Sequence, residues 1–149
     1  SERFTPPSPP VSLGKMSYHE MWSFFANLFP EYQHRIHLSD KEYSLCTIDS
    51  IREFVEWDEV DRKKYIAEVF DCDDYARALA GEFARHTGWS AFPVTDIWGD
   101  LYGGHAFCVV VAYPSTEDLT PTVYFVEPQN DVEIAPELVA DMTLWAIMM

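Results

Sequence analysis

The apolar residues of this chain change their spacing near Gly88, and this change restricts the possible folds more than any other feature. Before Gly88 they recur at the spacing of one helix face, and after it they alternate or run together as in strands. Helices followed by strands predict an α+β domain, with the N-terminal helices packed on a C-terminal antiparallel sheet.

Three segments before Gly88 have helical spacing. Residues 15–28 predict a helix that ends before Pro30, and residues 48–70 predict one or two helices with a break within 57–61. A third helix begins at Cys72, where Asp71 is placed to cap the first turn. Its apolar side chains share one face: Cys72, Tyr75, Ala76, Leu79, Ala80 and Phe83.

Four strands are predicted after Gly88, over residues 91–98, 106–113, 123–126 and 142–149. Turn residues between the first two, and a longer polar connection to the third, predict an antiparallel meander. Residues 1–14 are rich in proline and predict an extended arm, so one domain over residues 15–149 remains.

Charge and composition exclude several classes of partner. The chain of 149 residues has a net charge of −15 and only 10 Lys plus Arg, so it lacks a basic surface for nucleic acid. It has no apolar run long enough for a membrane span and no signal-peptide pattern. Its 3 cysteines are too few for a disulfide framework. We therefore expect a soluble protein, with the cytoplasm favoured and the oligomeric state open.

Cys72 and His105 are the residues best placed for chemistry. A thiol in the first turn of a helix is close to free backbone N–H groups, which favour the thiolate. His105 follows two glycines and begins a predicted strand, so it is placed to act as a general base. The segment after the next strand offers three groups that can orient its imidazole: Glu127, Asn130 and Asp131.

Three short blocks carry a resemblance to a known family. Residues 70–76 (Phe-Asp-Cys-Asp-Asp-Tyr-Ala), 104–107 (Gly-His-Ala-Phe) and 126–129 (Val-Glu-Pro-Gln) resemble the papain-like cysteine protease domain at the C-terminus of the fairy-ring mushroom agglutinin. The first block is also similar, more loosely, to bacterial transglutaminase-like cysteine peptidases. The resemblance covers residues 70–129 and implies a papain-like or transglutaminase-like fold.

The family resemblance also implies roles for individual residues. It implies a calcium-dependent cysteine hydrolase, a peptidase acting on peptide or protein substrates, with Cys72, His105 and Glu127 as catalytic triad. Asn130 in place of Glu127 would give an ordinary papain-type site. The calcium ligands implied are Asp71, Asp73 and Gln129, and hard oxygen donors suit this ion. A simpler reading is that the two aspartates only cap the helix.

Two further functions stay open at this point. The same thiol chemistry suits a transglutaminase-like acyl transferase or a cell-wall amidase. The same fold also suits a module without turnover, such as a calcium-responsive binding domain, because a fold does not fix its function.

Overall fold

A computed structural model of the protein describes residues 5–149. Its centre is a six-stranded sheet in the order β2-β8-β4-β5-β6-β7. The strands are β2 (Ile36–His37), β4 (Val94–Asp100), β5 (Gly104–Ala112), β6 (Thr122–Glu127), β7 (Val132–Ile134) and β8 (Thr143–Met148). Only the pair β2–β8 is parallel. A separate antiparallel pair joins β1 (Gly14–Ser17) to β3 (Glu42–Leu45).

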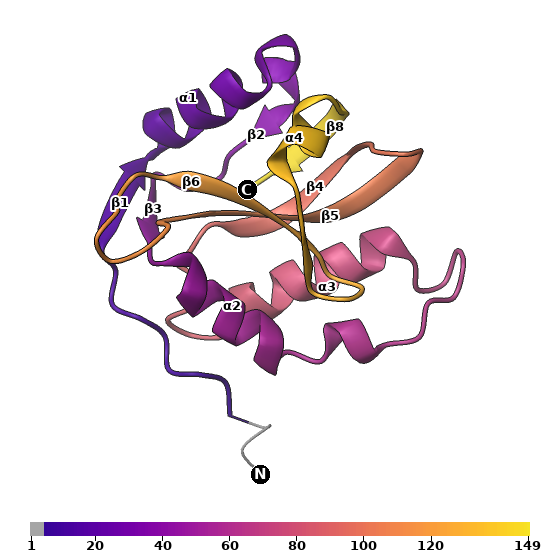
Figure 1. Ribbon diagram of the computed structural model, residues 1–149, viewed down its shortest axis with the longest axis horizontal. Coiled ribbons are helices and arrows are strands. Elements are labelled where there is room, and N and C mark those ends of the chain that lie inside the picture. The colour runs from indigo at the N-terminus through magenta and orange to yellow at the C-terminus, as the bar shows by residue number, and fades with distance from the viewer. Residues whose placement is uncertain (1–4) are drawn as a thin grey trace.

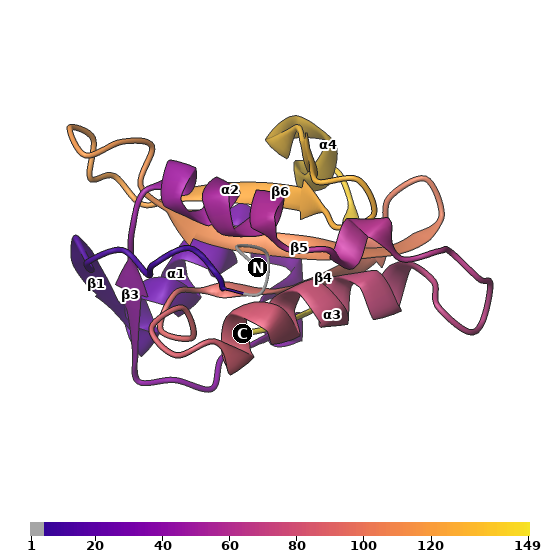
Figure 2. The same cartoon turned by 90° about the horizontal axis from the view of Figure 1, so that it is seen from below.

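Helices cover both faces of the large sheet (Figure 1). Helix α1 (Tyr18–Leu28), with the 3-10 turn η2 (Pro30–Arg35), lies on one face. Helices α2 (Ile48–Trp57) and α3 (Cys72–Arg85) lie side by side on the other, as Figure 2 also shows. The short elements η3 (Val60–Arg62) and α4 (Pro136–Ala140) complete the chain. The fold is therefore a mixed α/β arrangement with a sheet at its core.

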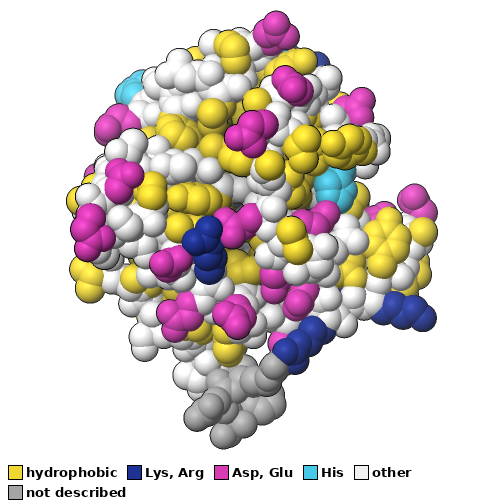
Figure 3. All heavy atoms as spheres, in the orientation of Figure 1, with side chains coloured by type: hydrophobic (Ala, Val, Ile, Leu, Met, Phe, Trp, Pro, Cys, Tyr) yellow, Lys and Arg dark blue, Asp and Glu magenta, His cyan; other side chains and the backbone are white. Residues whose placement is uncertain are grey.

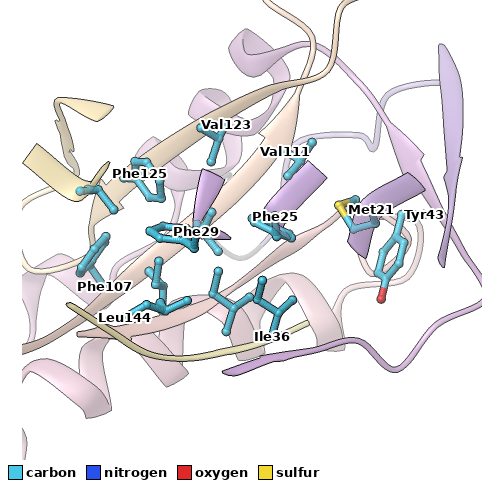
Figure 4. Packing of buried hydrophobic residues seen from close by; sticks show 14 of the residues in the cluster. Met21, Phe25, Phe29, Ile36, Tyr43, Phe107, Val111, Val123, Phe125 and Leu144 are labelled. Atoms are coloured by element: carbon cyan, nitrogen blue, oxygen red, sulfur yellow. The ribbon is translucent and has the colours of Figure 1, made fainter. Parts of the chain in front are cut away.

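Strand β5 is buried on both faces, because each face carries a helix layer. Phe107, Val109 and Val111 belong to the cluster on the α1 side, part of which Figure 4 shows. Ala106 and Cys108 belong to the cluster that contains α2 and α3. The continuous apolar run of this strand thus connects two separate cores.

Local capping explains where the helices start. In α1 the Ser17 hydroxyl accepts from the Glu20 N–H at 3.1 Å, and Glu20 Oε1 accepts from the Ser17 N–H at 3.0 Å. This capping box fixes the first turn, so Met21 and Phe25, four residues apart, both point into the core. Helix α3 starts at Cys72 with Asp71 as N-cap, which confirms that predicted boundary.

Two predicted helices differ from the structure. Residues 14–17 form strand β1, so the first helix starts at Tyr18. In the segment 48–70, α2 ends at Trp57, within the predicted break at 57–61, but the short η3 takes the place of a second helix after it. Glu68 has a φ of 61°, which a right-handed helix does not allow. The first half of the chain therefore contains strands that the expected order of helices, then strands, did not include.

The proline-rich arm lies at the opposite end of α3 from Cys72. The Trp89 indole N–H donates to the Pro7 carbonyl at 2.8 Å, just beyond the C-terminal end of this helix. Residues 1–4 of the predicted arm lie outside the described residues. Within residues 5–149, no helix is both long and apolar enough to cross a membrane.

Candidate functional site

Cys72 is the first residue of α3 and its thiol is partly exposed. The backbone before it is held by a capping box in which Asp74 Oδ2 accepts from the Asp71 N–H at 3.2 Å. The N–H groups of the first helical turn have no partners within the helix, and they give this end a partial positive charge. The Cys72 thiol therefore lies at the positive end of α3, beside unpaired backbone N–H groups.

His105 and Glu127 form a hydrogen-bonded pair. Their side chains come from the second residue of β5 and the last residue of β6, and the imidazole Nε2–H donates to Glu127 Oε1 at 2.6 Å. The exposed fractions of the two side chains are only 21% and 17%. The imidazole also stacks on the Phe107 ring, with 5.7 Å between ring centroids. The second carboxylate oxygen, Oε2, is buried without a hydrogen-bond partner.

The start of α3 lies at the same end of the molecule as this pair. The Arg77 guanidinium, one turn into α3, lies over the Trp98 ring at 4.8 Å from its centroid, and its Nη1 donates to Asp73 at 3.0 Å. In the β4–β5 register Trp98 pairs with Ala106, the neighbour of His105. These contacts connect the first turn of α3 to the end of β5 that carries His105.

The thiol and the imidazole are nevertheless not joined. Within residues 5–149, the Cys72 thiol makes no hydrogen bond to His105 or to any other side chain. Strand alternation explains this, because His105 and Glu127 share the sheet face of Phe107, which belongs to the α1-side core. Helix α3 covers the opposite face. The three residues predicted as a triad therefore lie at one end of the fold, but of these three only His105 and Glu127 are joined by a hydrogen bond.

The other two cysteines are enclosed. Cys46 is buried, and this burial raises the pKa of its thiol to about 12. Cys108 is fully buried in β5, and burial, followed by Asp96 and Glu127, raises the pKa of its thiol. Its Sγ–H donates to the Ala76 carbonyl at 3.4 Å. Cys72 is therefore the only thiol of the three with access to a ligand.

Three aspartates gather at the first turn of α3. One carboxylate oxygen from each of Asp71, Asp73 and Asp74 lies within 4.8 Å of the others. The oxygen donors fit a hard cation such as calcium. However, Asp73 already pairs with Arg77, and Asp71 and Asp74 share the capping box. Helix capping therefore accounts for much of this arrangement without an ion.

The turn between β6 and β7 carries the remaining predicted residues. Asn130 Oδ1 accepts from the Val132 N–H at 2.9 Å, so its side chain stabilises the turn, and the hydrogen bond to His105 is made by Glu127 instead. Gln129 lies in the same turn, and none of the described contacts joins it to the three aspartates. Sequence reasoning missed Arg77 and Trp98, although the spacing of Asp73 and Arg77 is that of a helical ion pair.

No protein-family model and no curated protein sequence matches the chain. Several solved structures are similar to it. One is the complex of PSL1a, the lectin of Polyporus squamosus, with E64: the TM-score is 0.68 and the identity 22%, over 89% of this chain and 49% of the lectin chain. Another is Polyporus squamosus lectin bound to the human-type influenza-binding epitope Neu5Aca2-6Galb1-4GlcNAc: the TM-score is 0.57 and the identity 26%, over 75% of this chain and 41% of the lectin chain. This chain thus spans half or less of the lectin's length.

These likenesses overturn the cysteine peptidase expected from the sequence. The similar structures are those of a lectin, which disagrees with the hydrolase, acyl transferase and amidase expected from the sequence. The resemblance to papain-like and transglutaminase-like proteases, the catalytic triad, and the peptide substrate are corrected with it. The calcium-responsive module does not fit a lectin neighbour well either.

Proposed function

We propose that this chain is a ligand-binding module whose site lies at the N-terminal end of α3, around the Cys72 thiol. One observation carries the proposal: Cys72 is partly exposed at a helix N-terminus, whereas Cys46 and Cys108 are buried. A partly exposed thiol can be reached by a ligand, and the unpaired N–H groups at the helix end offer hydrogen-bond donors beside it.

The segment before α3 supplies apolar surface beside the thiol. Its apolar side chains are unusually exposed, at 51%, 47% and 69% for Tyr65, Ile66 and Val69. A backbone bridge between Ile66 and Phe70 holds this segment as a turn that leads directly into Asp71. Exposed apolar side chains at the entrance to a polar site are typical of a surface that covers part of a ligand.

E64 is the ligand to test first, because the PSL1a structure is a complex with it and resembles 89% of this chain. E64 carries an epoxide, so we propose that it binds at Cys72 by a covalent bond. The sulfur attacks an epoxide carbon, the carbon–oxygen bond opens, and the ring oxygen takes a proton from water. The step forms one S–C bond and requires no turnover.

Mass spectrometry of the intact protein after incubation with E64 tests the proposal. We expect a gain of one E64 molecule, located at Cys72 by peptide mapping, and no gain for Cys72→Ser. Cys108→Ser is the matched control and keeps the gain, because Cys108 is enclosed in β5. Unmodified protein, or modification at Cys46, would overturn the proposed site.

Carbohydrate binding is a second candidate, because one of the similar structures is a lectin bound to a sialylated trisaccharide. Two exposed aromatic residues offer flat surfaces for a sugar ring: Tyr102 is 88% exposed and Trp145 is 47% exposed. The Trp145 ring lies beside Gly104, where an added Cβ would meet it at 2.7 Å. The net charge of −15 opposes an anionic sugar.

Calorimetric titration with Neu5Aca2-6Galb1-4GlcNAc and with its neutral part, Galb1-4GlcNAc, tests this second candidate. We expect the neutral sugar to bind more tightly, and Trp145→Ala to remove its binding. Absence of binding heat for both sugars would eliminate carbohydrate recognition by this chain and leave the Cys72 proposal untouched.

A further inference from the structure

A pocket between α2 and the β6–β7 edge of the sheet lies outside the Cys72 site. Its volume is about 290 Å³, close to the range of small-molecule pockets, which begins at roughly 300 Å³. Helix α2 forms one wall, and β6, the turn after it and β7 form the other. The pocket is therefore large enough for a small organic ligand.

The inner surface of this pocket is aliphatic. It is formed by four well-buried residues: Ile48, Ile51, Val55 and Val126. None of these side chains offers a hydrogen bond, so this part of the pocket favours an alkyl chain over water.

The rim of the pocket is acidic. Glu56, Asp131 and Glu133 line it, and Arg52 is the one cation among the lining residues. Arg52 is already engaged: its Nε and Nη2 donate to the two oxygens of Glu133 at 2.9 and 2.8 Å, and its Nη1 donates to Asp49 at 2.9 Å. In the described part of the chain, neither Glu56 nor Asp131 has an ion-pair partner.

Asp131 lies among other carboxyl groups. Burial, then Asp61 and Asp58, raises the pKa of Asp131 to about 7. Its backbone is fixed, because the Asp131 N–H donates to the Glu127 carbonyl at 2.8 Å and its φ is 61°. On the face of the molecule shown in Figure 3, acidic side chains are widespread and basic ones are sparse. Among the described residues, no Lys or Arg pairs with Asp131, so a cationic ligand would offset the repulsion between these carboxyl groups.

We infer that this pocket binds a small amphipathic monocation, a primary alkylammonium with a chain of roughly four to six carbons. The ammonium group, with its three donors, hydrogen-bonds Asp131 and Glu56. The alkyl chain covers the aliphatic surface formed by α2 and Val126. No part of this arrangement involves Cys72, so the inference is independent of the function proposed above.

Amide chemical-shift titration with hexylammonium tests the inference, with hexanol and hexanoate as neutral and anionic analogues. At about pH 8, where Asp131 is mostly ionised, we expect hexylammonium to shift amides of α2 and of residues 126–133. We expect its affinity to exceed that of hexanol by about tenfold or more, because the ammonium forms charge-assisted hydrogen bonds. Hexanoate should shift none of these amides.

Asp131→Asn removes a negative charge from the pocket and keeps a side chain of nearly the same size and shape. Asparagine tolerates the left-handed backbone at this position, so the fold is retained. We expect about a tenfold or larger loss of hexylammonium affinity, since the charge-assisted bond is removed. Asp141→Asn, at an exposed position after α4, is the control and leaves affinity unchanged. Equal affinities for hexanol and hexylammonium, unchanged binding to Asp131→Asn, or shifts confined to residues 71–74 would each overturn the inference.

Discussion

His105 Nε2 lies 2.6 Å from Glu127 Oε1, so the last residue of β6 is fixed to the second residue of β5. The two side chains are only 21% and 17% exposed, and the other carboxylate oxygen is buried without a partner. Hydrogen bonds to an ionised group contribute more than neutral ones when water is largely excluded. This pair therefore stabilises the end of the sheet next to the proposed ligand site.

We predict that Glu127→Ala lowers the free energy of unfolding by about 1.5–3 kcal/mol, because it removes a charge-assisted hydrogen bond and leaves His105 unpaired. Urea denaturation followed by circular dichroism measures the change. Asn130→Ala is the matched control from the same turn, and it loses only the bond to the Val132 N–H, about 1 kcal/mol. Equal losses of unfolding free energy in the two variants would contradict a larger stabilising contribution from Glu127 than from Asn130.

We predict that Cys72 reacts with iodoacetamide about 100-fold faster than Cys46 or Cys108, because alkylation requires an accessible thiolate. Burial raises the pKa of both other thiols, in the case of Cys46 to about 12. Brief exposure of the folded protein followed by peptide mapping gives the three rates. Preferential labelling of Cys46, or equal labelling of all three, would contradict the assignment of Cys72 as the reactive thiol.

Elements whose signals are local could be predicted from the sequence. Asp71 and the apolar face behind Cys72 define the start of α3, and the run of valines defines β5. Strands β2 and β7 are too short to give an alternating pattern. Residues 63–70 show why spacing alone is insufficient: Ile66 and Val69 are 47% and 69% exposed, so no core exists for a helix face to cover.

The candidate site depends on relationships that the sequence does not contain. The contact between His105 and Glu127 requires the β5–β6 register, in which Cys108 pairs with Val126. A shift by one residue would place the two side chains on opposite faces. Their separation from Cys72 depends on which face of the sheet α3 covers, and this is a property of the packed core. The local sequence identifies these residues as candidates, but it does not determine which of them are in contact.

Calcium binding near the start of α3 stays a prediction. The carboxylates of Asp71, Asp73 and Asp74 are close enough to share an ion, and calcium would relieve their mutual repulsion. We expect millimolar calcium to raise the melting temperature by a few degrees, as ligand binding to the folded state does, and Asp73→Asn to abolish the rise. Asp49→Asn is the control, since Asp49 lies at the start of α2. Unchanged melting after addition of calcium or a chelator would reject the site.

The last prediction concerns pH. Burial raises the pKa of Asp131 to about 7 from an ordinary value of 3.8, and the causes that follow are Asp61 and Asp58. The folded protein therefore binds a proton at Asp131 more tightly than the unfolded chain. Its contribution to stability is fully present below about pH 4 and is lost as the pH rises through about 7.

Asp131→Asn removes this titration and keeps the turn. A shift of about three pKa units corresponds to roughly 4 kcal/mol, which screening at a half-exposed carboxyl group reduces to about 1–2 kcal/mol. We expect the variant to be more stable than the natural sequence by this amount at about pH 8, and equally stable below about pH 4. Urea denaturation of both proteins across this pH range gives the difference in their free energies of unfolding. All other titrating groups are the same in the two proteins, so their contributions cancel in this difference. A constant difference at all pH values would show that Asp131 titrates normally and that its carboxyl neighbours do not act on it.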